Sequence, residues 1–209
     1  TAAEDVFSKD GFFANVFPIE PIGQVKSCEV DYLDIATVSD GFKFAFENAG
    51  YMHDGTIYTT KVQAVVEEPI PLKQLLEKDV DEKYYITKNL EKWEYLKGAK
   101  KIERTAKNGH KYTFSEGPVA FPDDIEKPAR TMLTSESSLN RSTHVVKDPQ
   151  TGRLRLLTPI ETERIQGFDD NWTNTGMPEK FRYFCMGNAL VVPMITRMGK
   201  KLGEIISNE

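Results

Sequence analysis

The chain has 209 residues, of which 39% are hydrophobic, 28% charged and 11% aromatic, so it can bury a core without a metal or a disulfide to support it. No apolar run approaches the roughly 20 residues that a membrane-spanning helix needs, and the N-terminal stretch lacks the features of a signal peptide. We therefore expect a cytoplasmic, nucleoid-associated protein with no membrane partner. Cys28 and Cys185 are the only cysteines, and without a Cys/His cluster they predict reduced thiols and no metal site.

The formal net charge of −5 argues against a uniform affinity for nucleic acid, but the charge is distributed unevenly. Residues 97–111 contain six basic side chains and one acidic one, and residues 127–155 contain six basic and two acidic ones. Either run alone is as readily explained as a solvated face. The two runs together favour a surface that faces phosphates.

Strands and a turn are expected early in the chain. Phenylalanines alternate with other residues over 42–46, which is the period of a strand with one buried face. Asp54-Gly55, placed between two apolar pairs, is a strong signal for a two-residue hairpin turn. We therefore expect strands over residues 42–62.

Helices and a second hairpin are expected next. A short helix is predicted near 72–77, and a longer one over 88–97, with Thr87 as its N-cap and Gly98 as a left-handed terminal residue. The dipeptide Asn108-Gly109 then predicts a hairpin whose arms carry much of the basic charge. These arms are residues 101–105 and 111–114.

The tail after a turn at residues 148–152 reads as helical. Thr158 and Glu161 have the spacing of a capping box, Pro159 suits the first helical position, and Gly167 suits a helix stop. A last amphipathic helix is expected over about 189–206, beginning near Pro193 or bent there. This change in character divides the chain into residues 1–147 and residues 148–209.

The residues give no sign of self-contained catalysis. No Ser/His/Asp, HExxH or paired-carboxylate spacing occurs, and no glycine-rich phosphate loop is present. Cys185 lies between Phe184 and Met186, with no neighbour that would activate a thiolate, so we expect a buried structural thiol. No catalytic residue is assigned in this chain.

Two segments of the tail resemble motifs of one enzyme family. Arg155–Phe168, followed by Asn171-Trp172-Thr173, resembles the ninth conserved motif of the DNA cytosine-5 methyltransferases, and Arg182–Met194 resembles the tenth. Each alone is explained by a capped helix, or by a glycine turn that enters an amphipathic helix. Both together, in this order and close to the end of the chain, form a specific signal. Residues 127–144 are similar to the end of the target recognition domain in a bacterial restriction-modification branch of the family, and residues 1–126 look like the same variable domain.

The resemblance implies an α+β chain. Residues 1–147 would be a loop-rich, mainly β target recognition domain, and residues 148–209 would be helices that complete a Rossmann-like α/β methyltransferase domain missing from this chain. The family places its S-adenosylmethionine motif, its Pro-Cys loop with the nucleophile and its Glu-Asn-Val motif before the position of Thr1. Because Thr1 is not a methionine, we expect an excised C-terminal portion that is inactive alone.

The expected partners follow from this reading. They are double-stranded DNA and an N-terminal catalytic half, with self-association of the isolated fragment because its tail helix would lack the domain that it packs on. The alternative left open is a separate DNA-recognition subunit of a split methyltransferase, or a sequence-specific DNA-binding module without catalysis.

The resemblance also suggests which residues contact DNA. Arginine pairs well with guanine and asparagine with adenine, which makes Arg130, Arg141 and Asn140 candidate base readers. Further candidate donors and acceptors for DNA are Thr131, Ser135 and Thr143. Each of these residues is about as readily a structural polar group. The candidate phosphate contacts are Lys100, Lys101, Arg104 and Lys107.

The remaining roles concern support and cofactor. By resemblance, polar residues of the ninth motif organise the recognition domain against the catalytic domain; they are Arg155, Glu161, Arg164 and Gln166. In the tenth motif, the turn at Gly187-Asn188-Ala189 is expected to enter a helix, with Asn188 as its N-cap. By resemblance, the ligand there is S-adenosylmethionine, and Asn188 and Ala189 line its pocket.

Overall fold

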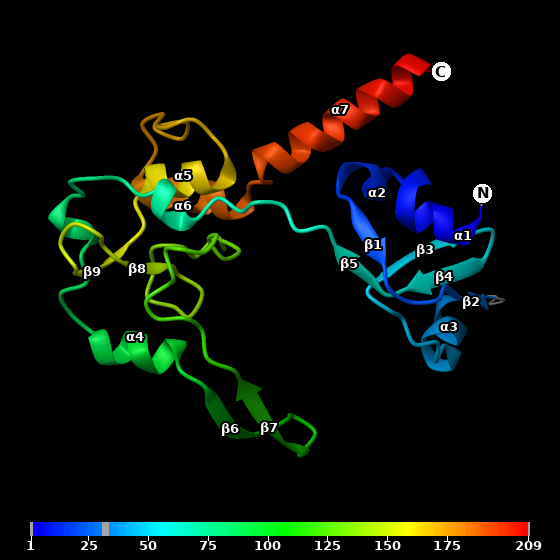
Figure 1. The fold of residues 1–209 in the computed structure, drawn as a ribbon. Helices are drawn as coiled ribbons and strands as arrows, with labels where there is room; N and C mark the ends of the chain where they lie inside the picture. Colours follow the sequence, from blue (N-terminus) through cyan, green and yellow to red (C-terminus); the bar gives the residue numbers. More distant parts are fainter. Residues whose placement is uncertain (1, 31–33, 209) are drawn as a thin grey trace. The chain divides into compact units, whose positions relative to one another are not determined.

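The computed structural model describes residues 2–30 and 34–208 (Figure 1). The chain forms two compact units, one made of Thr1–Glu68 with Thr196–Glu209 and the other of Pro69–Ile195, which we call the first and the second unit. The expected boundary between residues 147 and 148 lies inside a hairpin, because β8 (Val145–Lys147) pairs with β9 (Leu154–Leu156). The functional division at that boundary stays a prediction.

The first unit is built on two small antiparallel sheets. One has the order β2 (Lys26–Glu29), β4 (Thr56–Thr60) and β3 (Ala49–His53), and the other pairs β1 (Ile19–Pro21) with β5 (Val62–Ala64). Short helical segments complete it: α1 (Ala3–Asp5), η1 (Val6–Asp10), α2 (Phe12–Val16) and α3 (Ile35–Gly41). The predicted turn between β3 and β4 is confirmed, since Asp54 and Gly55 have φ values of 46° and 75°.

The strand predicted over the alternating phenylalanines is wrong. Residues 42–48 are not in a strand, and the helix before them, α3, begins at Asp34, whose carboxylate accepts the Thr37 amide at 2.8 Å. The rings of Phe42, Phe44 and Phe46 contact one another, with centroids 5.5, 6.2 and 6.3 Å apart. The alternation therefore reflects an aromatic cluster on an extended segment, which has the same period as a strand.

The second unit is an assembly of short elements joined by long loops. They are η2 (Leu72–Gln74), η3 (Glu82–Tyr84), α4 (Leu90–Lys97), β6 (Lys100–Thr105), β7 (Lys111–Glu116), β8, β9, α5 (Pro159–Gln166) and α6 (Glu179–Asn188), with the start of α7 (Val192–Asn208). Leu72, Val146 and Leu157 form the centre of its core. Figure 1 shows the β6–β7 hairpin extending from the end of α4, away from α5 and α6.

Some helix ends differ from the predictions. The expected helix near 72–77 is a single 3-10 turn, η2. Helix α4 begins after Asn89, which has a left-handed φ of 61°, rather than after Thr87. Gly98 ends α4 in an extended conformation with φ −68°, and its amide still closes the helix by donating to the Glu94 carbonyl at 2.9 Å.

The side chain of Cys185, which was expected to be buried, is half-buried in the structure.

The ninth-motif helix follows its predicted ends closely. In α5 the Thr158 hydroxyl accepts the Glu161 amide at 3.2 Å, and the Glu161 carboxylate accepts the Thr158 amide at 2.8 Å. Gly167 ends α5 with a left-handed φ of 83°. Pro193 lies at the start of α7, so the last helix begins there instead of bending.

Candidate nucleic-acid interface

The side chain of Arg130 is held by the fold. Its Nε donates to Asp123 Oδ1 at 2.5 Å and its Nη2 to Asp123 Oδ2 at 3.2 Å, a bidentate pair. The same guanidinium donates to the carbonyls of Ser142 and Thr143 at 3.3 and 3.4 Å. Asp123 also accepts the Val145 amide at 2.9 Å, so this ion pair ties the start of the 130–143 loop to β8.

Arg141 is held in a similar way at the base of the β6–β7 hairpin. Its Nη1 donates to the carbonyls of Leu96 and Gly98 at 3.2 and 3.3 Å, and its Nη2 donates to the carbonyl of Gly117. Leu96 and Gly98 precede β6, whereas Gly117 follows β7. One guanidinium therefore joins both ends of the hairpin to the loop.

Asn140 closes the same loop on itself. Its Oδ1 accepts the amides of Ser142 and Thr143 at 2.7 and 3.1 Å, and its Nδ2 donates to the Ser135 carbonyl at 2.9 Å. The Thr143 hydroxyl donates to the Ser138 carbonyl at 2.6 Å. These are the turn-forming contacts typical of asparagine and threonine. Thr131 and Ser135, by contrast, are exposed.

A buried polar cluster that sequence reasoning missed supports this loop. His144 is fully buried; its amide donates to Glu136 Oε1 at 2.7 Å, and its Nδ1 lies 3.0 Å from Glu136 Oε2. Lys97 is 1% exposed and its ammonium donates to the Thr143 carbonyl. Burial lowers the pKa of Lys97 to about 8, and the nearby Asp123 carboxylate opposes that shift. The sequence did hold one signal, because Glu136 is an acid isolated within a basic run.

The four predicted phosphate contacts of the hairpin fall into two pairs. The Lys100 ammonium lies 3.6 Å from Glu116, donates to the Leu96 carbonyl at 3.2 Å and sits over the Tyr95 ring. The Arg104 guanidinium lies 3.9 Å from the centre of the Phe114 ring. Lys101 and Lys107 are exposed, and within the described residues neither ammonium has an ion pair or hydrogen bond. The second pair is therefore free to bind phosphates.

The predicted organising residues form a buried network around α5. The Arg155 side chain is fully buried; its Nε donates to Asp148 at 2.8 Å, and its terminal nitrogens donate to the two Glu161 oxygens at 2.7 and 2.8 Å. Burial alone would raise the pKa of Asp148, but hydrogen bonds from Arg155 and Thr151 outweigh it and hold that pKa below its usual value. The contacts of Arg155 within the second unit thus join β9, α5 and the 148–152 turn.

Two further residues connect α5 to its neighbours. Arg164 pairs with Asp170 at 2.6 Å and donates to the Leu75 carbonyl at 3.0 Å. Gln166 is buried and donates to the Met186 carbonyl of α6 at 2.7 Å. All four predicted organising residues therefore lie together around one helix.

Sequence reasoning missed a second ion pair on the same helix. Glu163 is fully buried, and its carboxylate accepts hydrogen bonds from the Arg182 guanidinium of α6 at 2.9 Å and from the Thr173 amide at 3.0 Å. Burial alone would raise the pKa of Glu163, but hydrogen bonds from Thr173 and Arg182 outweigh it and lower that pKa. The pair couples the two segments that resemble the ninth and tenth motifs.

The helix start predicted at Asn188 is wrong. Gly187 and Asn188 are the last residues of α6, and the Asn188 side chain donates back to the Phe184 carbonyl at 3.0 Å. The following amide, that of Ala189, donates to the Met186 carbonyl at 3.3 Å. A helix C-terminus presents carbonyls rather than free amides, so the segment offers no anion site. Asn188 itself is exposed, as a side chain that contacts a cofactor must be.

Gly187 brings the loop of residues 130–143 and α6 into direct contact. A Cβ atom placed on Gly187 would lie 2.5 Å from the Leu133 carbonyl oxygen and would overlap the Thr134 amide. Only glycine allows two backbones to approach so closely. The loop that carries the candidate base readers thus rests on the residue before Asn188.

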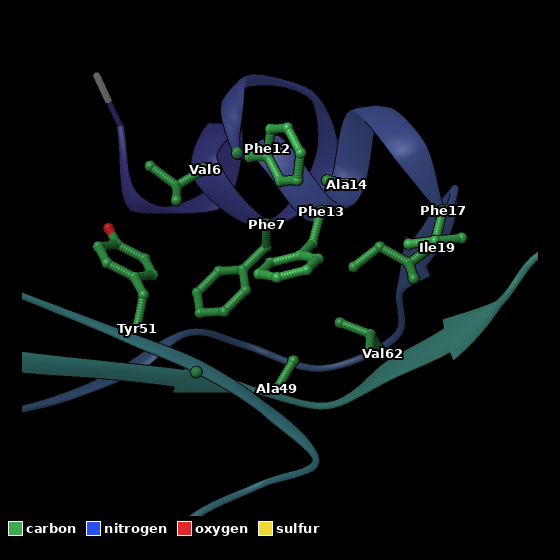
Figure 2. A pocket seen from close by; sticks show the side chains of 12 residues that line it. Val6, Phe7, Phe12, Phe13, Ala14, Phe17, Ile19, Ala49, Tyr51 and Val62 are labelled. Carbon is green, nitrogen blue, oxygen red and sulfur yellow. The ribbon is translucent and has the colours of Figure 1, made fainter. Parts of the chain in front are cut away.

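An apolar cleft of about 430 Å³ lies in the first unit (Figure 2). Figure 2 shows Phe7 and Phe13 reaching from the helical segment toward Ala49 and Val62, with Tyr51 at one end. The Phe7 and Tyr51 rings contact at 5.1 Å, and Tyr51 stacks on Tyr58 at 4.9 Å. The lining of this cleft has no charged side chain, so the cleft is not a site for phosphates.

Nowhere in 2–30 and 34–208 do three or more His, Cys, Asp or Glu residues gather as metal ligands would. None of the helices in these ranges has the length and apolar character to cross a membrane.

Known proteins resemble this chain closely. Over residues 27–204 it matches the family model for C-5 cytosine-specific DNA methylase. It is 47% identical over 207 residues to the type II methyltransferase M.Sau3AI of Staphylococcus aureus, covering 98% of this chain and 50% of that protein. It is 28% identical over 138 residues to the type II methyltransferase M.DsaV of Dactylococcopsis salina, covering 66% of this chain and 36% of that protein.

The solved structure of the Entamoeba histolytica methyltransferase EhMeth is also similar, with a TM-score of 0.46 and 16% identity over 93% of this chain and 56% of that one. This chain spans about half the length of the first of these relatives and about a third of the second. The family match over most of the chain and the 47% identity together show that the chain belongs to the C-5 cytosine-specific DNA methylase family.

Proposed function

We propose that this chain is the C-terminal part of a restriction-modification DNA (cytosine-5)-methyltransferase. Residues 1–147 would act in target recognition, and residues 148–209 would complete the methyltransferase domain. The observation that carries the proposal is the 47% identity to a type II methyltransferase over nearly the whole chain. The ion pair between Glu163 and Arg182 supports it, because it couples the two segments that resemble the ninth and tenth motifs.

The reaction, methylation of cytosine at C5 within a duplex, determines which functions such a chain must supply. The base is extruded from the stack, a thiolate adds to C6, and a methyl group is transferred to C5. Loss of the C5 proton then expels the thiolate and restores the aromatic ring. S-Adenosylmethionine, when bound, supplies that methyl group. This chain would hold the duplex in register, and Asn188 and Ala189 would line one wall of the cofactor pocket.

We further propose a division of labour among the candidate DNA contacts. Lys107, which has no partner within the described residues, would bind a phosphate, with Lys100 and Arg104 beside it, and Lys101, equally without a partner there, would contact the DNA. Arg130, Arg141 and Asn140 make multiple contacts to the fold, so they would position the recognition loop. Thr131 and Ser135 are exposed on that loop and would contact DNA, whereas Thr143 would support it from below.

The test is methyl transfer by the complete gene product. Incubated with duplex DNA and radiolabelled S-adenosylmethionine, it should produce 5-methylcytosine at one sequence. Label in N6-methyladenine, or no incorporation, would refute the proposal. The 209-residue chain expressed alone should bind duplex DNA without transferring label, and turnover by that chain would show that the nucleophile lies within it.

A further inference from the structure

The β6–β7 hairpin has two chemically different faces. Residues paired across antiparallel strands share a face, and the faces alternate along each strand. The register pairs Lys101 with Ser115, Glu103 with Thr113, and Thr105 with Lys111. These six residues make up what we call the polar face. The opposite, mixed face consists of Lys100, Ile102, Arg104, Tyr112, Phe114 and Glu116.

Four side chains of the mixed face, those of Lys100, Arg104, Phe114 and Glu116, make contacts within the second unit. Lys100 pairs with Glu116 at 3.6 Å, and Arg141 of the recognition loop lies 3.7 Å from the same carboxylate. Arg104 stacks on Phe114 at 3.9 Å. These contacts stiffen the ribbon and fix its base against α4 and the loop.

The polar face makes no such contacts. All six of its side chains are exposed, and within the described residues none has a hydrogen bond or an ion pair. The chemistry of this face matches a ligand that presents many donors and acceptors in a row.

We propose that the polar face enters the major groove of duplex DNA and contacts base edges, an inference that rests on the proposed function. The major groove is about 12 Å wide and admits a two-stranded β-ribbon. Each arm has six residues and is about 20 Å long, so it can follow the groove past several base pairs.

The net positive charge of the hairpin favours DNA as the partner. Residues 100–116 carry five basic and two acidic side chains in a protein whose formal net charge is −5. One of the two acids, Glu116, is paired with a lysine of the same hairpin. Lys107 lies in the connecting turn, where it would contact a phosphate as the ribbon enters the groove.

Each side chain of the polar face has a base edge that it suits. Lysine donates to guanine O6 and N7, glutamate accepts from the cytosine amino group, and threonine and serine serve with either kind of base. Glu103 argues against phosphate binding alone, because a carboxylate at the centre of that face would repel a phosphate.

The experiment measures discrimination between DNA sequences. The complete gene product selects a preferred duplex from a random pool, and its affinity for that duplex is compared with its affinity for an unselected one at two salt concentrations. The variants are Thr113→Val, which keeps the shape of the side chain, and Lys101→Ala. The matched control is Ile102→Thr on the mixed face, and Ser115→Ala replaces Thr113→Val if that variant fails to fold.

Loss of a base contact should lower the affinity ratio by about 5- to 150-fold in the polar-face variants, with Ile102→Thr unchanged. Equal loss on both duplexes with a weaker salt dependence would indicate phosphate contacts only and overturn the proposal, as would an unchanged ratio. Selection without methyl transfer by the parent protein would refute the proposed function while leaving this inference standing.

Discussion

Gly187 of α6 lies against the backbone of Thr134, so close that a methyl group on Gly187 would overlap the Thr134 amide. The contact joins two parts of the chain about fifty residues apart, the loop with the candidate base readers and the end of a helix with the proposed cofactor wall. A change at Gly187 should therefore affect both.

Gly187→Ala should destabilise the protein by about 1–3 kcal/mol, the usual range for overpacking against a backbone that cannot move freely. It should also weaken binding of the preferred duplex, because the loop must shift. Thermal unfolding and DNA affinity are the measurements. The control is Gly203→Ala in α7, where nothing lies within 4 Å of the added methyl and helix propensity favours alanine. If the two variants behave alike, the close approach has no energetic role.

Two arginines of one segment should differ sharply in their contribution to stability. Arg155 is fully buried between Asp148 and Glu161, and Arg155→Ala should cost about 3–5 kcal/mol by leaving two carboxylates buried without a counter-ion. Arg153 pairs with Glu82 in solvent, and Arg153→Ala should leave the unfolding midpoint in urea unchanged. A similar loss in both variants would mean that burial does not distinguish them.

The buried Lys97 should give the protein a distinctive alkaline pH dependence. Its pKa is lowered by burial from 10.5 to about 8, so between these pH values the unfolded chain holds a proton that the folded chain has released. Stability should therefore rise with pH in this window, by up to about 1.4 kcal/mol per pH unit. Below pH 8 both states hold the proton, so the Lys97 titration gives no pH dependence there. Lys97→Met removes the titration, and the difference between parent and variant in urea unfolding from pH 7 to 10.5 isolates it. A difference that is flat across this range would contradict the lowered pKa.

Helix α7 should make the 209-residue chain self-associate. Several of its large apolar side chains are exposed, among them Met194 at 48%, Leu202 at 50% and Ile206 at 71%. They recur at helical spacing, so they form an unpartnered apolar face. Light scattering should show mass rising with concentration, and Leu202→Lys with Ile206→Lys should suppress the rise. Lys200→Glu serves as the charge-changing control outside this apolar set, and a monomer at every concentration would count against the prediction.

The contacts that residues make within a few positions of the chain could be predicted from the sequence. The Asp54-Gly55 turn, the hairpin around Asn108-Gly109 and the Thr158–Glu161 capping box all appear as expected. In each case the deciding hydrogen bonds or φ angles involve residues at most a few positions apart, so composition and spacing suffice. The family resemblance is of the same kind, because it rests on two short ordered segments.

The roles of several polar residues and of one glycine depend on contacts with residues far away along the chain, which only the tertiary structure shows. From the sequence, Arg141 is a candidate base reader, but in the structure its guanidinium donates to the carbonyl of Gly117, 24 residues away. Lys97 likewise belongs to a basic run, but its ammonium is buried and donates a hydrogen bond to the carbonyl of Thr143, 46 residues away. The sequence suggests that Gly187 forms a turn, whereas in the structure the nearby Leu133 backbone leaves no room for a side chain at this position. The sequence by itself thus determined the local turns, the caps of α5 and the family, whereas the tertiary structure decided which polar groups remain free for DNA, because burial and distant backbone carbonyls compete for the same donors.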